Sequence, residues 1–267
     1  MRAFVINLDR SAERRSHVTA QLTRAGLDYE FVAGVDGRDL EPDAIAHAVS
    51  AEAARQPWFR PGVMGCALSH LRAYQRIVEA GLPEALVLED DIMLADDLGE
   101  LTDALPGLLT GAEIVLVNYD SPSPCQMSSA GSVSLTPARK LVLPLDVEQP
   151  KSGAAYVITL EACRRLTEKA LPLRAMPDDW GFFFREGLID RMRCVTPMAV
   201  TKHPGFGSTV DYTPPTSLKM RVRDFIVRAD VPPFPQAIAY RRQRILRRQS
   251  RTVVVDQPFV TRPSRLD

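Results

Sequence analysis

The sequence predicts an α/β fold in which a mostly parallel sheet is flanked by helices. Short continuous apolar runs, typical of buried strands, alternate along the chain with amphipathic stretches of helical period. The chain also opens with strand, helix and strand over residues 3–37, an order that favours parallel pairing through a right-handed crossover. With 267 residues, of which 45% are apolar and 25% charged, the chain is long enough to bury one large core.

The order of the elements follows from the apolar runs and from the residues that bound them. Gly26 and Gly81 each follow a helical stretch, at the position where a left-handed residue is favoured. The segment from Ser121 to Ser134 is rich in Ser and Pro, which predicts a loop. Strands are predicted at residues 3–8, 29–37, 84–91, 112–120, 140–147 and 192–203, helices at residues 11–26, 62–81 and 97–109, a strand followed by a helix within 152–171, and a turn leading into a helix within 176–187.

Charge divides the chain into regions, although the formal net charge is zero. Residues 77–138 contain 11 acidic residues and no Lys or Arg, so this segment could attract a cation. Residues 217–251 contain ten basic and two acidic residues, so this segment could attract an anionic surface. The predicted organisation is an α/β domain over residues 1–215 and a basic C-terminal region over residues 216–267.

The basic C-terminal region includes the stretch "IAYRRQRILRRQ", which has a helical pattern. Ile238, Ile245 and Leu246 can form an apolar strip among six Arg residues, a weak signature of a surface-binding helix. Contact of residues 238–251 with an anionic membrane is therefore predicted. A solvated helix or an oligomer contact would show the same pattern. Nucleic acid is not an expected partner, because aromatic residues for base stacking are sparse there.

The sequence predicts a cytoplasmic protein with peripheral contact at the inner membrane through the basic region. No run approaches the length of a membrane-spanning helix, and the apolar stretch before Asn7 is too short for a signal peptide. Cys66, Cys125, Cys163 and Cys194 lie far apart without a Cys-x-x-Cys pair, which argues against a zinc ribbon and predicts free thiols.

The stretch "ALVLEDD" ends an apolar strand in three consecutive carboxylates, Glu89, Asp90 and Asp91. Side chains alternate along an extended backbone, so Glu89 and Asp91 are expected on one side and Asp90 on the other. Ligands of open α/β sheets bind beyond the carboxyl ends of the strands, and paired carboxylates there can hold a hard divalent cation that in turn binds phosphate. The alternative is a strand that runs into a helix N-terminus with solvated acids.

Two further motifs fall where a nucleotide would lie. In "NLDRSAERR" the polar residues Asn7 and Asp9 end the first strand, and Arg10 and Arg14 could make forked contacts with phosphate. The alternative is a solvated helix start. The chain has no Gly-Lys-[Ser/Thr] after "GVMG" and no Gly-x-Gly-x-x-Gly after the first strand, so standard ATP and NAD folds are disfavoured.

The motif "GVMGCALSH" predicts a glycine-containing turn that lets backbone approach a ligand, with Ser69 and His70 at its rim. The alternative is a turn and a helix whose Ser and His cap the helix or fill the core.

The motif "PDDW" places Asp178 and Asp179 before Trp180. A carboxylate beside an aromatic ring suits a sugar site, because the ring can pack on a pyranose face while the acid accepts a hydroxyl proton. The alternative is a helix N-terminus with favourable charges. His203 in "KHPGFGS" is a candidate third metal ligand or phosphate contact, although a single His is more often structural.

The order of "INLDRSAERR", "GVMGCALSH", "LVLEDD", "GAAYVIT" and "PDDW" resembles glycosyltransferase family 25. This is the family of bacterial lipopolysaccharide and lipooligosaccharide sugar transferases, many of them galactosyltransferases. The resemblance covers roughly residues 1–210, and "GCALSH" with "LEDD" is its specific part.

The resemblance implies a GT-A-like fold with a Rossmann-type nucleotide half, an acidic-x-Asp motif and a Mn²⁺ or Mg²⁺ ion that bridges to the donor diphosphate. It also implies a UDP-sugar donor, foremost UDP-galactose, and an inverting transfer to a hydroxyl of a glycan or glycolipid acceptor.

The resemblance assigns roles to residues 65–70, 89–91, 178 and 179, and the residue patterns above supply the other candidates. Metal ligands would be Asp91, Glu89 and His203; donor contacts would be Asn7, Asp9, Arg10, Arg14, Ser69, His70 and Asp90; and the general base would be Asp179 or Asp178. Two other classes remain open at this point. The same acids could serve a metal-dependent nucleotidyl- or phosphotransferase, or the chain could be a non-catalytic relative that binds a nucleotide-sugar.

Overall fold

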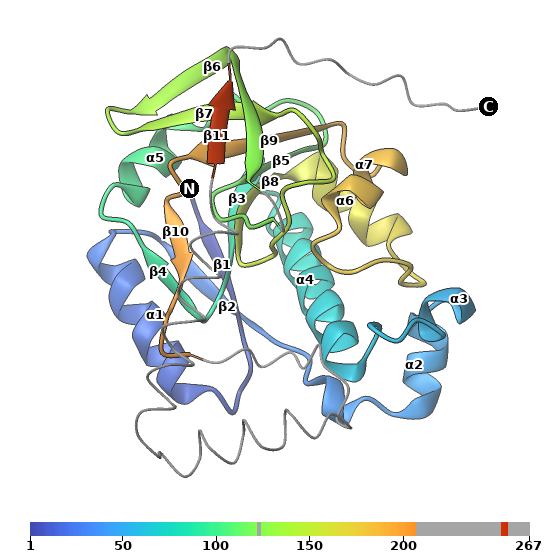
Figure 1. Cartoon of the computed structure of the whole chain (residues 1–267). Coiled ribbons are helices and arrows are strands. Elements are labelled where there is room, and N and C mark those ends of the chain that lie inside the picture. The colour runs from blue at the N-terminus through green and yellow to red at the C-terminus, as the bar shows by residue number, and fades with distance from the viewer. Residues whose placement is uncertain (122–123, 207–251, 256–267) are drawn as a thin grey trace, which may run out of the picture.

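The computed structural model describes residues 1–121, 124–206 and 252–255. A large sheet forms its middle layer, and helices cover both faces of that sheet (Figure 1). The α/β class predicted from the sequence is confirmed. The predicted membrane-binding helix at residues 238–251 lies outside the described residues and stays a prediction.

Helices and strands alternate in the opening β1-α1-β2 unit, and later elements come in groups of helices and groups of strands. The strands of the large sheet are β1 (Ala3–Asn7), β2 (Tyr29–Ala33), β3 (Glu84–Glu89), β5 (Glu113–Leu116), β6 (Cys125–Thr136), β7 (Arg139–Pro144), β8 (Ala155–Thr159), β9 (Arg191–Thr196) and β11 (Thr252–Val255). A separate antiparallel pair consists of β4 (Ile92–Leu94) and β10 (Val200–Lys202). The helices are α1 (Ala12–Arg24), the 3-10 helix η1 (Gly37–Asp39), α2 (Pro42–Ala48), α3 (Ala51–Ala54), α4 (Pro61–Ala80), α5 (Leu98–Ala104), α6 (Leu160–Lys169) and α7 (Trp180–Arg185).

The described strands of the large sheet follow the order β11-β6-β7-β9-β5-β8-β3-β1-β2. The strand β1 pairs in parallel with both β2 and β3, and α1 makes the crossover, which confirms the β–α–β opening. Among these nine strands, only β8 and β7 run against the other seven, so the sheet is mostly parallel as predicted. The ends of β1 and β3 therefore meet at one edge, where Ile6 pairs with Glu89.

Alternation along β1 decides which helices cover which face of the sheet. Phe4 packs on one face with side chains of α4 and α6, whereas Ala3 and Val5 pack on the other with side chains of α1 and α5. Burying both faces in this way makes the sheet edge at the end of β1 and β3 the place where polar side chains can gather.

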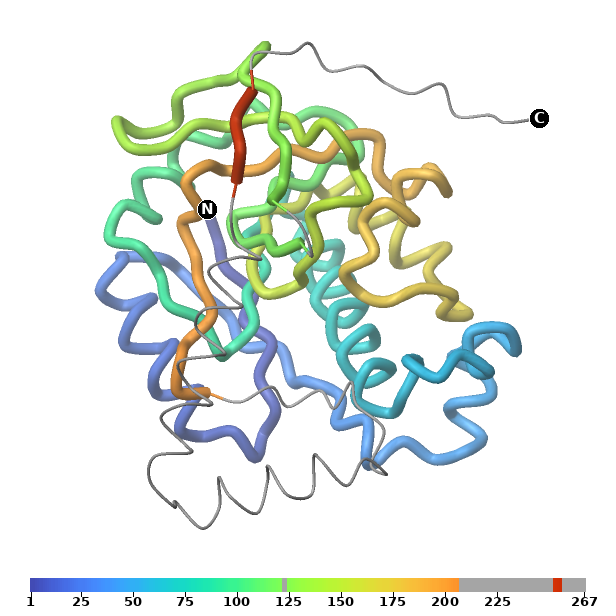
Figure 2. Tube along the Cα trace, viewed as in Figure 1, coloured from blue at the N-terminus to red at the C-terminus, as the bar shows by residue number. Residues whose placement is uncertain are grey.

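The helices α2 and α3 were not anticipated. No residue of α2 is buried, so its sequence carries no apolar period that would reveal it. Both helices pack beside the start of α4 in a small apolar cluster that includes Val49, Phe59 and Val63 (Figure 2).

The predicted loop from Ser121 to Ser134 is wrong, because most of it belongs to β6. Strand β6 pairs with β7 and with β11, so two partner strands supply backbone hydrogen bonds that a Ser-rich sequence does not foretell. The strand β11 comes from the basic C-terminal region, which thus adds a strand to the main sheet. None of the helices in the described residues is both long enough and apolar enough to cross a membrane.

The predicted glycine turn in "GVMGCALSH" is also wrong, because α4 already begins at Pro61. Gly65 lets this helix pack directly on the backbone that follows β2: a Cβ at residue 65 would lie 2.5 Å from the carbonyl oxygen of Val35 and 2.6 Å from the amide nitrogen of Gly37. Ser69 secures the same contact, since its hydroxyl accepts from the Val35 amide (2.8 Å) and donates to the Gly65 carbonyl (2.6 Å). The glycine therefore serves helix packing.

Candidate functional site

A cleft of about 260 Å³ opens where β1 and β3 end, beside the first turns of α4. Segments far apart in the sequence meet there, because β10 pairs with β4 directly after β3 (Figure 2). The predicted site residues that line the cleft are Arg10, Arg14, Ser69, His70, Glu89, Asp90, Asp91 and Asp178.

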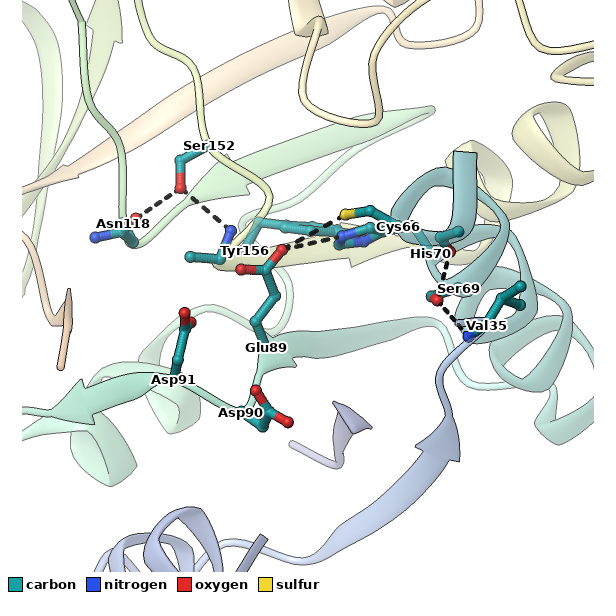
Figure 3. A network of polar contacts seen from close by, with 12 residues as sticks. Val35, Cys66, Ser69, His70, Glu89, Asp90, Asp91, Asn118, Ser152 and Tyr156 are labelled. Carbon is teal, nitrogen blue, oxygen red and sulfur yellow. Dashed lines mark hydrogen bonds and ion pairs between the residues drawn. The ribbon is translucent and has the colours of Figure 1, made fainter. Parts of the chain in front are cut away.

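The three carboxylates after β3 separate as alternation predicts. The side chains of Glu89 and Asp91 point to one side of the chain, and Asp90 lies apart from them (Figure 3). Asp90 is buried and fully engaged: its Oδ2 accepts from Asn7 Nδ2 at 2.7 Å, and its Oδ1 lies 2.9 Å from Arg14 Nη1. This side of the motif therefore fixes the end of β1 and the start of α1 to β3.

The negative charge of Asp91 is only partly compensated by neighbouring cations. Burial and the neighbouring carboxylate of Glu89 raise its pKa to about 6, and Arg14 only partly offsets them. The Arg14 guanidinium lies 3.8 Å from Oδ2, beyond hydrogen-bond distance. The other carboxylate oxygen of Asp91, Oδ1, is buried and has no hydrogen-bond partner among the described residues. Such an oxygen at a cleft wall is what a hard cation would satisfy.

Glu89 points into the α4 side of the cleft. Its Oε1 lies 3.6 Å from His70 Nε2 and 3.8 Å from Cys66 Sγ (Figure 3). Burial raises the pKa of Glu89, but His70, Lys202 and the Cys66 thiol outweigh it, so the net direction is downward. Glu89 is therefore anionic at neutral pH and available as a second oxygen ligand beside Asp91.

Lys202 is a site residue that the sequence analysis did not identify. It lies on β10, lines the cleft, and places Nζ 3.7 Å from Oδ2 of Asp120. Burial lowers its pKa, but the carboxylates of Glu89, Asp120 and Asp91 more than offset this, so the net direction is upward. Only the pairing of β10 with β4 brings this lysine to the acids, and the sequence carries no sign of that pairing.

Asp178 and Asp179 are adjacent in sequence but occupy different surroundings. Asp178 lines the cleft, and burial together with Glu89 and Asp120 raises its pKa. Asp179 is not among the lining residues, and its Oδ1 lies 2.6 Å from Nζ of Lys151. The structure thus brings Asp178, and not Asp179, to the other acids of the site.

The predicted stacking role of Trp180 is wrong. Its side chain is fully buried in the core, and its indole Nε1 donates to the carbonyl oxygen of Ser152 at 3.1 Å. A ring with no exposed surface cannot pack on a sugar. Trp180 instead holds the turn that precedes β8.

That turn contains a strained residue. Ser152 has a φ of 129°, a conformation that L side chains rarely adopt. Its hydroxyl donates to Oδ1 of Asn118 (2.7 Å) and accepts from the Ala154 amide (3.2 Å), and these contacts hold the turn (Figure 3). The next residue, Gly153, lines the cleft beside His70. The motif "SGAAYVIT" predicted a strand here but not this turn.

Besides Asp179, three predicted site residues lie outside the cleft lining that the structure describes: Asn7, Asp9 and His203. Asp9 is exposed. The ring of His203 packs against His17 and Phe206, at centroid distances of 4.6 Å and 4.2 Å, and only its backbone amide contacts the acids, donating to the Asp91 carbonyl at 2.7 Å. The ligand role of His203 stays a prediction that these contacts do not support.

Arg10 and Arg14 both line the cleft, where Arg10 is exposed and the Arg14 side chain is largely buried against Asp90; their phosphate contacts stay a prediction. Arg10 Nε lies 2.7 Å from Oδ2 of Asp36, and Arg14 lies over the ring of Phe206, with its Cζ 5.5 Å from the centroid. Asp36 was not identified from the sequence; the side chains of Arg38 and Arg10 hold its pKa well below the usual range.

The cleft therefore brings together three kinds of side chain in a small volume. Asp91 and Glu89 offer oxygen ligands to a hard divalent cation, and the unpartnered Oδ1 of Asp91 shows that the residues fit such an ion. The two arginines offer positive charge to an anionic ligand. Asp178 offers a carboxylate of raised pKa, the property of a general base.

Comparison with known proteins connects this geometry to a family. The family described as "Glycosyltransferase family 25 (LPS biosynthesis protein)" matches residues 1–180. This range includes both β-strand ends, the α4 motif and the acids at 178 and 179.

Individual relatives match over shorter ranges. A "Glycosyltransferase 25 family member" of Aedes aegypti is 38% identical over 33% of this chain and 16% of its own length. The "Lacto-N-neotetraose biosynthesis glycosyltransferase LgtB" of Neisseria meningitidis serogroup B is 29% identical over 36% of this chain and 34% of its own length. An "Inactive glycosyltransferase 25 family member 3" of Mus musculus is 30% identical over 35% of this chain and 17% of its own length.

The alignments thus span about a sixth to a third of the lengths of these curated relatives. The family match itself covers two thirds of the chain and includes the whole acidic motif at the end of β3. The chain belongs to glycosyltransferase family 25.

Proposed function

We propose that this chain is a metal-dependent, inverting glycosyltransferase that moves a sugar from a UDP-sugar to a hydroxyl of a lipopolysaccharide-type glycan. The observation that carries the proposal is the carboxylate of Asp91, which has a buried, unpartnered oxygen beside Glu89 in the cleft at the end of β3. Family membership supports sugar transfer as the reaction. UDP-galactose is the donor to test first, because it is the donor that the family resemblance implies.

On the donor side, Asp91 and Glu89 would hold Mn²⁺ or Mg²⁺. When bound, such an ion acts as a Lewis acid that stabilises negative charge on a leaving diphosphate. Arg10 and Arg14 line the same cleft and would bind phosphate oxygens there. Asp90 contributes indirectly, since it fixes the guanidinium of Arg14.

On the acceptor side, Asp178 is the proposed general base. The oxygen of the acceptor hydroxyl attacks the anomeric carbon, the bond from that carbon to the UDP oxygen breaks, and the hydroxyl proton passes to Asp178. A single displacement of this kind inverts the anomeric centre. The raised pKa of Asp178 brings its proton affinity closer to that needed for the transfer.

Two alternatives use the same fold. A metal-dependent nucleotidyl- or phosphotransferase would use the acids on a different acceptor and release pyrophosphate in place of UDP. A non-catalytic relative would bind the nucleotide-sugar without turnover, and the mouse relative is named inactive. The presence of both Asp91 and Asp178 in one cleft favours catalysis, because a binding module needs no second carboxylate of raised pKa there.

We also propose that the basic stretch at residues 238–251 contacts an anionic membrane surface, which would keep a cytoplasmic enzyme near a glycolipid acceptor. Co-sedimentation with vesicles of anionic lipid should retain the full chain at low salt, and replacing all six Arg from 241 to 251 with Gln should release it. Equal retention of both proteins would exclude this contact.

The transfer reaction is tested by UDP release from UDP-galactose, UDP-glucose and their N-acetyl forms. We expect release that requires Mn²⁺ or Mg²⁺ and that falls by at least about 10²-fold in Asp91→Asn, because the ion loses a ligand. Asp96→Asn, the same change at an exposed neighbour, is the matched control and should keep wild-type release. Unchanged release in Asp91→Asn, or pyrophosphate as the product, would contradict the proposal.

The base assignment predicts different outcomes for two adjacent acids. Asp178→Asn should lower kcat by about 10²- to 10⁴-fold with donor KM changed little, since the variant cannot accept the hydroxyl proton. Asp179→Asn, with the same change one residue away, should stay within a few-fold of wild type, because Asp179 is engaged by Lys151. Equal losses in the two variants would remove the assignment to Asp178.

The raised pKa of Asp91 predicts a pH dependence of stability in the metal-free protein. Its native pKa of about 6 exceeds the ordinary 3.8, so the native state binds more protons between these values and the free energy of unfolding falls as pH rises through them. In chelator, Asp91→Asn should therefore gain roughly 1–3 kcal/mol over wild type between about pH 4 and pH 7. Denaturation curves that shift equally for both proteins across this range would refute the assignment.

A further inference from the structure

Three side chains of different chemistry meet on the α4 wall of the cleft: Cys66, His70 and Glu89. Their potential ligand atoms all lie within 4.8 Å of one another. Cys66 and His70 are four residues apart on α4, so they share one face of the helix, and Glu89 reaches them from the end of β3 (Figure 3). The proposed donor chemistry uses Glu89 but leaves the thiol and the imidazole unexplained.

The imidazole of His70 has an unused nitrogen. The residue is only 2% exposed, and Nε2 has no hydrogen-bond partner among the described residues. Its other nitrogen, Nδ1, lies 2.7 Å from the Tyr156 hydroxyl, which lies 2.9 Å from the Tyr74 hydroxyl. Binding of a cation requires the tautomer with the proton on Nδ1, which donates to Tyr156 and leaves the lone pair of Nε2, 3.6 Å from Glu89 Oε1, for the ion. A buried polar atom without a partner calls for a ligand.

Space beside that nitrogen is kept free by Gly153. A Cβ at this position would lie 3.0 Å from His70 Nε2 and 3.7 Å from Glu89 Oε1. The strained turn at Ser152 holds the glycine there, through the contact of its hydroxyl with Asn118. The strained residue thus holds a residue without a side chain next to Nε2 of His70.

We infer that Cys66, His70 and Glu89 form a binding site for a zinc-class divalent cation, with a fourth position open to the cleft. Zinc bonds of about 2.0–2.3 Å to N, O and S give tetrahedral edges of about 3.3–3.6 Å. The observed separations are 3.6 Å for His70 Nε2 to Glu89 Oε1 and 3.8 Å for Cys66 Sγ to the same oxygen, and all three ligand atoms lie within 4.8 Å of one another. Closing the site therefore needs side-chain shifts of up to roughly 1 Å.

The ligand set selects the ion. A thiolate and an imidazole suit Zn²⁺ and Co²⁺, whereas Mn²⁺ and Mg²⁺ prefer the all-oxygen environment near Asp91. The Tyr156 hydroxyl on Nδ1 is the kind of outer partner that orients a metal-binding histidine. Binding forms a bond from the cation to Sγ of Cys66 and releases the thiol proton to solvent.

Occupancy of this site has a consequence for the proposed reaction. With Oε1 bound on the α4 side, Glu89 would offer only its other oxygen to a donor-bound ion beside Asp91, and the positive charge of the zinc ion would oppose that second ion. Zn²⁺ should therefore raise the Mn²⁺ concentration needed for half-maximal UDP release. This consequence rests on the proposed function, whereas cation binding by the three residues does not.

The direct test uses Co²⁺ as a spectroscopic probe of the full chain. Titration of the metal-free protein should produce intense visible bands of a four-coordinate ion and a near-ultraviolet thiolate-to-cobalt charge-transfer band, and one equivalent of Zn²⁺ should remove both. Cys66→Ser should lose the charge-transfer band. Cys163→Ser, which alters a buried thiol on α6, is the matched control and should retain it.

Two variants outside the ligand set test the geometry without removing a ligand. Tyr156→Phe removes the partner of Nδ1 and should weaken Zn²⁺ binding by about 10- to 100-fold. Gly153→Ala should weaken it at least as much by filling the space at Nε2. Thermal melting without metal verifies that each variant is folded.

A charge-transfer band that is missing in the wild type, or that persists in Cys66→Ser, would overturn the zinc site. Unchanged Zn²⁺ affinity in folded Gly153→Ala would also overturn it. A cobalt spectrum that behaves as expected, in a protein that releases no UDP from any donor, would support the zinc site and count against the proposed function. The two proposals can therefore fail separately.

Discussion

Repulsion among carboxylates at the carboxyl end of β3 is the constraint on which the site depends. The chain places Glu89, Asp90 and Asp91 in succession there, and the start of α7 adds Asp178. Neutralisation is uneven: Arg14 and the end of β1 satisfy Asp90, whereas Asp91 keeps a raised pKa and an unpartnered oxygen. A divalent cation bound at Asp91 would neutralise the excess negative charge, and this supports the interpretation of the acids as a metal and donor site.

Local pattern predicted the part of the site that lies on one strand. Alternation along "LEDD" separated Asp90 from Glu89 and Asp91, and the β–α–β opening placed the end of β1 beside them. Features made by long-range pairing were missed. Lys202 reaches the acids only because β10 pairs with β4, and the Ser-rich segment after Ser121 is a strand because β7 and β11 flank it. Neither partner can be identified from the residues of the segment itself.

The contacts that require glycine at particular positions could not be predicted from the sequence. Gly65 was expected to bring backbone to a ligand, and it instead lets α4 contact the backbone after β2. That contact fixes the helix face that carries Cys66 and His70 toward Glu89. Gly153, in a motif predicted only as a strand, is the glycine that keeps space at the site. Which backbone or side chain a glycine approaches is decided by tertiary packing.

The central claim is that Asp91, with Glu89, holds a divalent cation against the diphosphate of the donor. Calorimetric titration of UDP into the full chain, with Mn²⁺ or with chelator, tests it most directly, because it needs neither the acceptor nor the correct sugar. The account predicts that Mn²⁺ lowers the Kd for UDP at least about tenfold in the wild type, or about 1.4 kcal/mol, and that Asp91→Asn abolishes this gain. An equal gain in Asp91→Asn, or none in the wild type, would contradict it.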